Sequence, residues 1–187
     1  TSISDSKAAF NGTKVSATDP TPSSAKINYG QDFDASNDWV DIGTNKNILN
    51  SVAATTIEAW VNIDGTSARR NILHISINGS DSSSRALIDI TSTEGIDVSG
   101  RSTDAEAIQT ETTSSSISTN VWHHVVGIID YTNDNMIVYV DGSSVSTTGT
   151  PAFSSTTTPA TNSDSVEIGS EARGTTALSS ATLDEIR

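Results

Sequence analysis

The chain has no cysteine, and it is poor in basic and aromatic residues. Without cysteine it can form no disulfide, thiolate metal site or cysteine nucleophile. Its 187 residues carry 10 Lys and Arg against 23 Asp and Glu, a formal net charge of −13. Nucleic-acid binding needs clustered lysine and arginine to displace counterions from phosphates, so this class of function is excluded. The acidity also disfavours an anionic membrane surface, and no apolar run is long enough for membrane insertion.

Serine and threonine are abundant, at about 30% of the chain. Hydrophobic residues make up 34% and charged residues 18%, which is lean for a globular protein but too rich for a disordered one. The length fits one domain with a buried core. An acidic, hydroxyl-rich and lysine-poor surface is typical of exported β-proteins, so we expect an extracellular or cell-surface location.

Short alternating segments recur along the chain, and no helical periodicity persists for more than two turns. The segment 56–63 (TIEAWVNI) places Ile57, Ala59, Val61 and Ile63 on one face. The other candidate strands are 38–43, 70–78, 85–91, 95–101, 121–130, 135–141, 165–169 and 182–187. The hydroxyl-rich stretches 102–119 and 147–165 are predicted surface loops, each with room for one short strand. This pattern predicts an all-β fold, an antiparallel two-sheet jelly-roll sandwich.

Four sequence segments follow one another in a characteristic order. They are 29–43 (YGQDFDASNDWVDIG), 56–61 (TIEAWV), 122–142 (WHHVVG followed by NMIVYVDG) and 168–187 (IG followed by LDEIR). Together they resemble the LamG-like jelly-roll domain, a branch of the concanavalin A-like superfamily that includes laminin G domains and pentraxins. Ala35 stands where this family usually has glycine. The resemblance implies a concanavalin A-like sandwich over most of the chain.

The resemblance also bears on domain organisation. We expect residues 1–187 to be a single LamG-like domain, a segment of a longer multidomain extracellular protein with incomplete terminal strands. The alternative is that another molecule completes the sheet, by self-assembly through edge strands.

Calcium is the cofactor that the resemblance implies. Jelly-roll relatives often hold a structural Ca²⁺ near the last strand, with the aspartate of the LDEIR-like motif as a ligand. Asp184 is therefore the first candidate ligand, and Asp34, in the opening motif, is the second. A salt bridge or a strand-end hydrogen bond is the alternative role for Asp184. The Asp and Asn residues of segment 130–135 resemble metal ligands, but such residues also favour hairpin turns, and we expect a turn there.

Aromatic residues suitable for stacking against a sugar are scarce. Trp39, Trp60 and Trp122 belong to the family-like motifs, and the resemblance implies that they pack in the core. This leaves Tyr131, in a predicted turn, and Tyr29 as candidate platforms.

No constellation of catalytic residues stands out. Glycosidases on this scaffold use two carboxylates close together on one strand face, but Glu58 has no acidic partner two residues on. The adjacent His123 and His124 must point to opposite faces of a strand, so they do not chelate one metal easily. We expect a structural, hydrogen-bonded His124, a surface or loop-facing His123, and a structural role for His74.

These observations favour a non-catalytic recognition or adhesion module that binds a glycan or a protein surface. The first alternative is a structural subunit or decoration domain of a surface layer, filament or virion. A polysaccharide-cleaving enzyme is the least favoured function, because no catalytic constellation stands out. Membership of the superfamily does not decide among these functions, since fold alone does not determine function.

Overall fold

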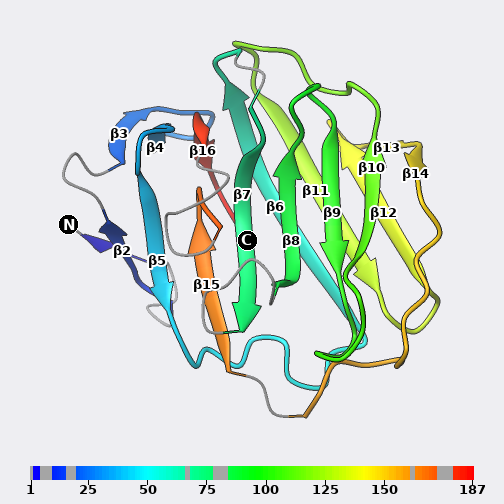
Figure 1. The fold of residues 1–187 in the computed structure, drawn as a ribbon. Helices are drawn as coiled ribbons and strands as arrows, with labels where there is room; N and C mark the ends of the chain where they lie inside the picture. Colours follow the sequence, from blue (N-terminus) through cyan, green and yellow to red (C-terminus); the bar gives the residue numbers. More distant parts are fainter. Residues whose placement is uncertain are drawn as a thin grey trace.

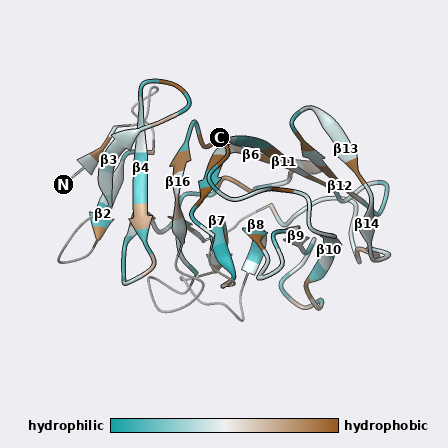
Figure 2. Ribbon diagram, turned by 90° about the horizontal axis from the view of Figure 1, so that it is seen from above, coloured by the Kyte–Doolittle hydropathy of each residue, from teal (hydrophilic) through white to brown (hydrophobic). Residues whose placement is uncertain are grey.

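The fold is a sandwich of two antiparallel β-sheets, as the sequence predicted (Figures 1 and 2). The computed structural model describes residues 2–4, 10–15, 20–65, 68–77, 84–160, 163–171 and 179–187. Seen from above in Figure 2, the two sheets form separate layers. The described residues include no helix that could span a lipid bilayer.

The two sheets differ in size. The nine-stranded sheet has the order β1 (Ser2–Ile3), β2 (Gly12–Val15), β5 (Trp39–Gly43), β15 (Asp164–Ile168), β7 (Arg70–Ile77), β8 (Ser84–Ile90), β9 (Ile96–Gly100), β10 (Gln109–Thr113) and β14 (Thr147–Thr148). The seven-stranded sheet has the order β13 (Ser143–Val145), β12 (Asn135–Val140), β11 (His123–Asp130), β6 (Ala54–Ile63), β16 (Ser180–Asp184), β4 (Tyr29–Asp34) and β3 (Thr21–Ser24). Segments distant in sequence are neighbours in both sheets, because β15 lies between β5 and β7 and β16 lies between β6 and β4.

Alternating apolar side chains of the two sheets meet in the core. The four predicted inward residues of β6, Ile57, Ala59, Val61 and Ile63, are all buried. The nine-stranded sheet contributes fully buried residues that include Ile72, Ile88, Ile96 and Val98. The sheets approach closely at Gly127 of β11, where a Cβ atom would lie 2.5 Å from Val98 of β9. Glycine at this position therefore sets how closely the two layers pack.

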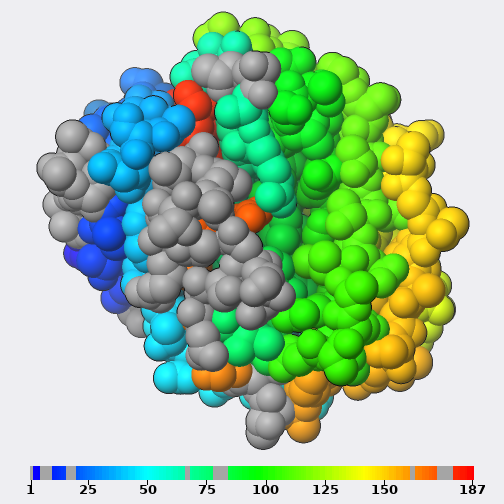
Figure 3. All heavy atoms as spheres, viewed as in Figure 1, coloured from blue at the N-terminus to red at the C-terminus, as the bar shows by residue number. Residues whose placement is uncertain are grey.

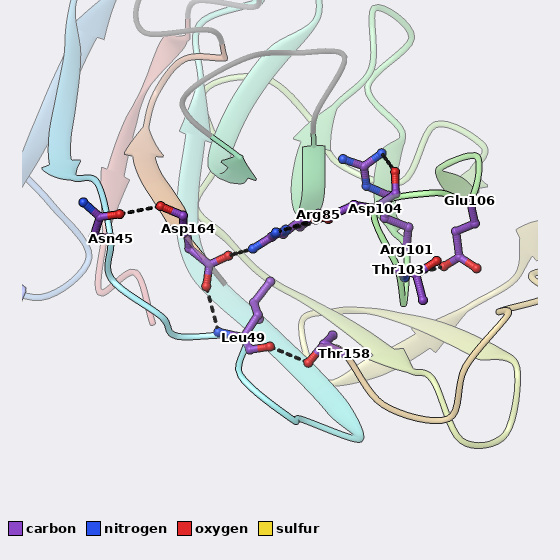
Figure 4. A network of polar contacts seen from close by, with 10 residues as sticks. Asn45, Leu49, Arg85, Arg101, Thr103, Asp104, Glu106, Thr158 and Asp164 are labelled. Carbon is purple, nitrogen blue, oxygen red and sulfur yellow. Dashed lines mark hydrogen bonds and ion pairs between the residues drawn. The ribbon is translucent and has the colours of Figure 1, made fainter. Parts of the chain in front are cut away.

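A network of polar contacts fastens the loops at one end of the sandwich (Figure 4). Arg85 is buried and donates to Asp164 at 2.5 Å and to both carboxylate oxygens of Asp104, at 3.0 and 2.8 Å. The other oxygen of Asp164 accepts a hydrogen bond from the Leu49 amide at 3.0 Å, and the Thr158 hydroxyl donates to the Leu49 carbonyl. Three irregular segments are thereby held to the nine-stranded sheet without regular secondary structure.

Short polar strands account for most of the difference between prediction and structure. The two predicted loops do contain one short strand each, β10 and β14. Sequence patterning missed β1 to β4 and β13; among these, β3 (Thr21–Ser24) has the sequence TPSS and no apolar alternation. β3 lies at the edge of its sheet, where Pro22 can be accommodated.

Candidate functional site

Trp60 lies on the outer face of the seven-stranded sheet and is only half-buried. Since Ile57, Ala59, Val61 and Ile63 point into the core, Glu58 and Trp60 must point outward. The prediction that Trp60 packs in the core is therefore wrong. The alternation of apolar residues along this strand already indicates that Trp60 points outward. The same prediction is wrong for Trp122, which is half-buried, whereas Trp39 is buried as predicted.

Three side chains form a row across neighbouring strands at Trp60. His124 of β11 and Asp184 of β16 both lie directly opposite Trp60, one on each side. The ring centroids of Trp60 and His124 are 5.1 Å apart with a tilt of 47°. His124 Nε2 lies 3.7 Å from a carboxylate oxygen of Glu58, the outward residue two positions before Trp60. The adjacent His123 lies opposite the core residue Val61, so the two histidines point to opposite faces as predicted.

The turn between β3 and β4 folds over this row. Lys26, in the turn, places its ammonium nitrogen 4.5 Å from the centre of the Trp60 ring. The amide of Ile27 donates to Asp184 Oδ2 at 2.8 Å, which holds the turn on the sheet. Gly30, just after the turn, has no room for a side chain, because a Cβ would collide with the Leu183 carbonyl oxygen. This close approach of the two strands requires glycine.

Residues after β16 complete the rim of the site. The amide and carbonyl of Arg187 pair with the carbonyl and amide of Glu58, both at 2.9 Å. The Arg187 guanidinium also lies 3.3 Å from a Glu58 carboxylate oxygen. We define the Trp60 face as the six residues Lys26, Glu58, Trp60, His124, Asp184 and Arg187. It combines an apolar aromatic ring with charged donors and acceptors at its edge.

The two predicted calcium ligands do not share a site. Asp184 is buried and accepts the Ile27 amide, while Asp34 is exposed and accepts the Ser36 amide at 2.8 Å. Asp34 lies opposite Ser180, at the other end of β16 from Asp184. Within the described ranges, no group of three or more His, Cys, Asp or Glu could hold a metal ion. A single carboxylate does not provide the several oxygen ligands that Ca²⁺ needs, so calcium binding at Asp184 stays a prediction.

Segment 130–135 forms a hairpin turn, as expected. Asp130 Oδ1 accepts the amides of Thr132 and Asn133 at 3.0 and 3.1 Å. These bonds from the turn backbone explain why polar residues gather there.

The outer face of the nine-stranded sheet carries a cluster of buried charges (Figure 3 looks onto this sheet). Arg69 pairs with Asp89 and, at 2.7 Å, with Glu171. Burial raises the pKa of Asp89 to about 8; Arg69 opposes this shift and the nearby Glu171 carboxylate adds to it. Asp89 and Glu171 are 0% and 4% exposed, so this carboxylate pair lies in no open cleft. His74 is also buried there and bonds to Ser84 at 2.8 Å, consistent with a structural role.

The two tyrosines proposed as sugar platforms have opposite surroundings. Tyr131 is buried, with its ring edge-to-face against Phe153 at 5.0 Å, so the prediction of an exposed platform there is wrong. Tyr29 is 75% exposed. It lines an apolar cavity of about 750 Å³ together with core residues of both sheets such as Phe33 and Val40.

Comparison with known proteins agrees with this architecture. The family model for the concanavalin A-like lectin/glucanases superfamily matches residues 34–187. No curated protein sequence matches the chain. The CBM40 domain of the Ruminococcus gnavus IT-sialidase, bound to α2,3-sialyllactose, is similar in structure with a TM-score of 0.60 and 17% identity. That match covers 94% of this chain and 86% of the other.

Two further solved structures share the fold. A SAP-like pentraxin from Limulus polyphemus has a TM-score of 0.55 at 15% identity, over 77% of this chain and 67% of its own. A structure of botulinum neurotoxin type C, whose cell entry depends on interaction with two ganglioside molecules, has a TM-score of 0.62 at 19% identity. It matches 100% of this chain and 45% of its own. At these identities the likeness shows the fold alone.

Proposed function

Because the chain belongs to the concanavalin A-like lectin/glucanase superfamily, we propose that it is a non-catalytic extracellular recognition module that binds a glycan at the Trp60 face. The observation that carries this proposal is the outward, half-buried Trp60 ring with charged groups at its rim. The acidic, hydroxyl-rich composition supports an extracellular location.

The chemistry of the face suits a pyranose sugar. A sugar ring has an apolar C–H face that packs on an indole, and hydroxyls at its edge that need hydrogen-bond partners. Glu58 can accept from hydroxyls, and Lys26 and Arg187 can donate to them through charge-assisted bonds. Lys26 now covers the indole, so a stacked sugar must displace its ammonium group. Loss of an exposed cation–π contact costs roughly 0.5–1 kcal/mol, which a stacked sugar can offset.

Structural neighbours suggest where to begin the search for a ligand. The CBM40 domain of the Ruminococcus gnavus enzyme is bound to sialyllactose, and the neurotoxin interacts with gangliosides. The cations Lys26 and Arg187 could face a sugar carboxylate here. Sialyllactose therefore belongs in a glycan panel beside neutral oligosaccharides.

The test is calorimetric titration of that panel into the wild-type chain, Trp60→Ala and Tyr139→Ala. Tyr139 is a matched control, since it is a half-buried aromatic residue on β12, two strands from Trp60 in the same sheet. We expect Trp60→Ala to weaken binding at least tenfold, about 1.4 kcal/mol, and Tyr139→Ala to leave it unchanged. Trp60→Ala should stay folded, because a half-buried ring loses less than the roughly 3–5 kcal/mol of a core tryptophan. Binding that survives in Trp60→Ala moves the site elsewhere, and no binding by the wild type overturns the proposal.

A structural subunit is the second candidate function, and one observation favours it. Large apolar side chains are exposed beside the apolar cavity, with Tyr29 at 75% and Phe10 at 40%. Exposed apolar residues around a cleft are typical of a surface that meets another protein. Sedimentation velocity over a range of concentrations tests this candidate, since a chain that stays monomeric at high concentration removes it.

A further inference from the structure

Three polar side chains from separate segments meet beside the start of β11. Ser118 lies in the loop between β10 and β11, His123 is the first residue of β11, and Asp141 directly follows β12. His123 Nδ1 lies 2.7 Å from Asp141 Oδ2, and His123 Nε2 lies 3.0 Å from the Ser118 hydroxyl. Neither the glycan proposal nor the family-like motifs assign a role to this group.

The hydrogen bonds determine which nitrogen of His123 carries the proton. The backbone amide of Ser118 points at Nε2 over 3.1 Å, and an amide can only donate. Nε2 must therefore be the acceptor, and in the neutral ring Nδ1 holds the proton and donates it to Asp141. Nε2 has one lone pair, which the amide and the hydroxyl of Ser118 share, so the hydroxyl lies as a nucleophile does beside a general base but can pass its proton only when the amide bond gives way.

Asp141 is held in place to support this tautomer. Its Oδ1 accepts the His124 amide at 2.9 Å while its Oδ2 accepts from His123. Burial raises the pKa of Asp141, but the bonds from the His124 amide and the His123 ring outweigh it and hold the pKa below its ordinary value. The carboxylate is therefore ionised at neutral pH and orients the imidazole.

A substrate can reach the serine. Ser118 is exposed, and the side chains of His123 and Asp141 are 13% and 49% exposed. The amide of Thr119, the next residue, donates no hydrogen bond to any part of the chain that the structure describes. The amide after a nucleophilic serine is one of the donors that stabilise an oxyanion in other hydrolases.

We propose that Ser118 is a base-activated nucleophile that hydrolyses small acyl esters, with His123 as the general base and Asp141 as a positioning residue. The serine oxygen attacks the ester carbonyl carbon and its proton passes to His123 Nε2. The bond to the alcohol oxygen breaks, and His123 returns the proton to the leaving alcohol. Water then attacks the acyl-serine as His123 takes its proton, the bond between the acyl carbon and Ser118 Oγ breaks, and His123 returns the proton to Ser118 Oγ, so that one ester and one water yield one alcohol and one acid.

The openness of the site selects the class of substrate. The exposed Ser118 offers little enclosure for a large acyl chain. The fitting substrates are small, accessible acyl groups such as an acetyl ester on a hydroxyl. This activity would replace the non-catalytic part of the proposed function and leave its glycan-binding part unchanged, because the Trp60 face is a separate site, so glycan binding and ester hydrolysis can fail separately.

The first experiment uses p-nitrophenyl acetate and a fluorophosphonate probe on the wild type, Ser118→Ala and Ser115→Ala. Ser115 is an exposed serine of the same loop and serves as the matched control. We expect Ser118→Ala to lose probe labelling and at least about tenfold of the hydrolysis rate, with Ser115→Ala unchanged. Equal labelling and equal hydrolysis in all three proteins would overturn the proposal.

A second experiment uses the absence of cysteine from the chain. Ser118→Cys and Ser115→Cys each introduce a single thiol, and the rate of iodoacetamide alkylation reports its activation. We expect the thiol of Ser118→Cys to be alkylated about tenfold faster than that of Ser115→Cys, and the added substitution Asp141→Asn to remove this difference without unfolding the protein. Equal alkylation rates at the two positions would show that His123 does not act as a base. This outcome overturns the proposal even if Ser118→Ala loses activity only because it unfolds.

Discussion

Replacing Asp89 with asparagine should remove a large part of the pH dependence of stability. Asp89 is fully buried on β8, where Arg69 and the side-chain amide of Asn71 contact its carboxyl group. Asp97 of β9 lies directly opposite, and Glu171 shares the Arg69 guanidinium. Several carboxyl groups thus lie around Arg69. Asp89 is the most buried of them, and its neutral, protonated form is favoured because it avoids both desolvation of a charge and repulsion from its neighbours.

The size of the effect follows from linkage. Burial, reinforced by Glu171, raises the pKa of Asp89 from 3.8 to about 8 in the folded protein. Between these values the folded chain keeps a proton that the unfolded chain releases, so the contribution of Asp89 to stability is fully present below about pH 4 and is lost as pH rises towards 8. The limiting slope for one proton is about 1.4 kcal/mol per pH unit. Asparagine keeps the shape of the neutral acid and leaves the Arg69–Glu171 pair intact, so it carries no such slope.

The assay is urea unfolding of the wild type, Asp89→Asn and Asp34→Asn at several pH values from 5 to 9. Asp34→Asn removes one exposed carboxyl group from the other sheet and controls for the change in net charge. We expect the stability of Asp89→Asn relative to wild type to rise by up to about 1.4 kcal/mol per pH unit up to pH 8, and then to level off. Parallel pH curves for wild type and Asp89→Asn would refute the reasoning, because they would mean that Asp89 is already ionised in the folded protein.

Two further predictions concern the turn over Trp60. Gly30→Ala should destabilise the protein by about 1–3 kcal/mol in denaturant unfolding, because its Cβ would collide with the Leu183 carbonyl; an unchanged midpoint would show that the turn can move away freely. Asp184→Asn should lower the melting temperature, because the Ile27 amide loses a charged acceptor. The same variant tests the calcium prediction, since any rise in melting temperature with millimolar Ca²⁺ should disappear in it, and a rise that persists excludes Asp184 as a ligand.

Local sequence pattern determined much of the fold. Side chains on a strand alternate with a period of two, so the apolar residues of 56–63 could be assigned to the core face without knowing the partner strands. The same alternation places Trp60 on the outer face, although its family-like motif had suggested the core. Where the pattern is absent, as in the polar edge strand Thr21–Ser24, the strand could not be foreseen.

Only the tertiary structure decided which strands are neighbours and which side chains meet. Lys26, Trp60 and Arg187 come together because β16 inserts between β6 and β4, a pairing that depends on burial across the whole chain. The Ser118–His123 contact and the raised pKa of Asp89 are likewise invisible in sequence. Alternation is a property of neighbouring residues along the chain, whereas hydrogen bonding and desolvation depend on groups that folding brings close.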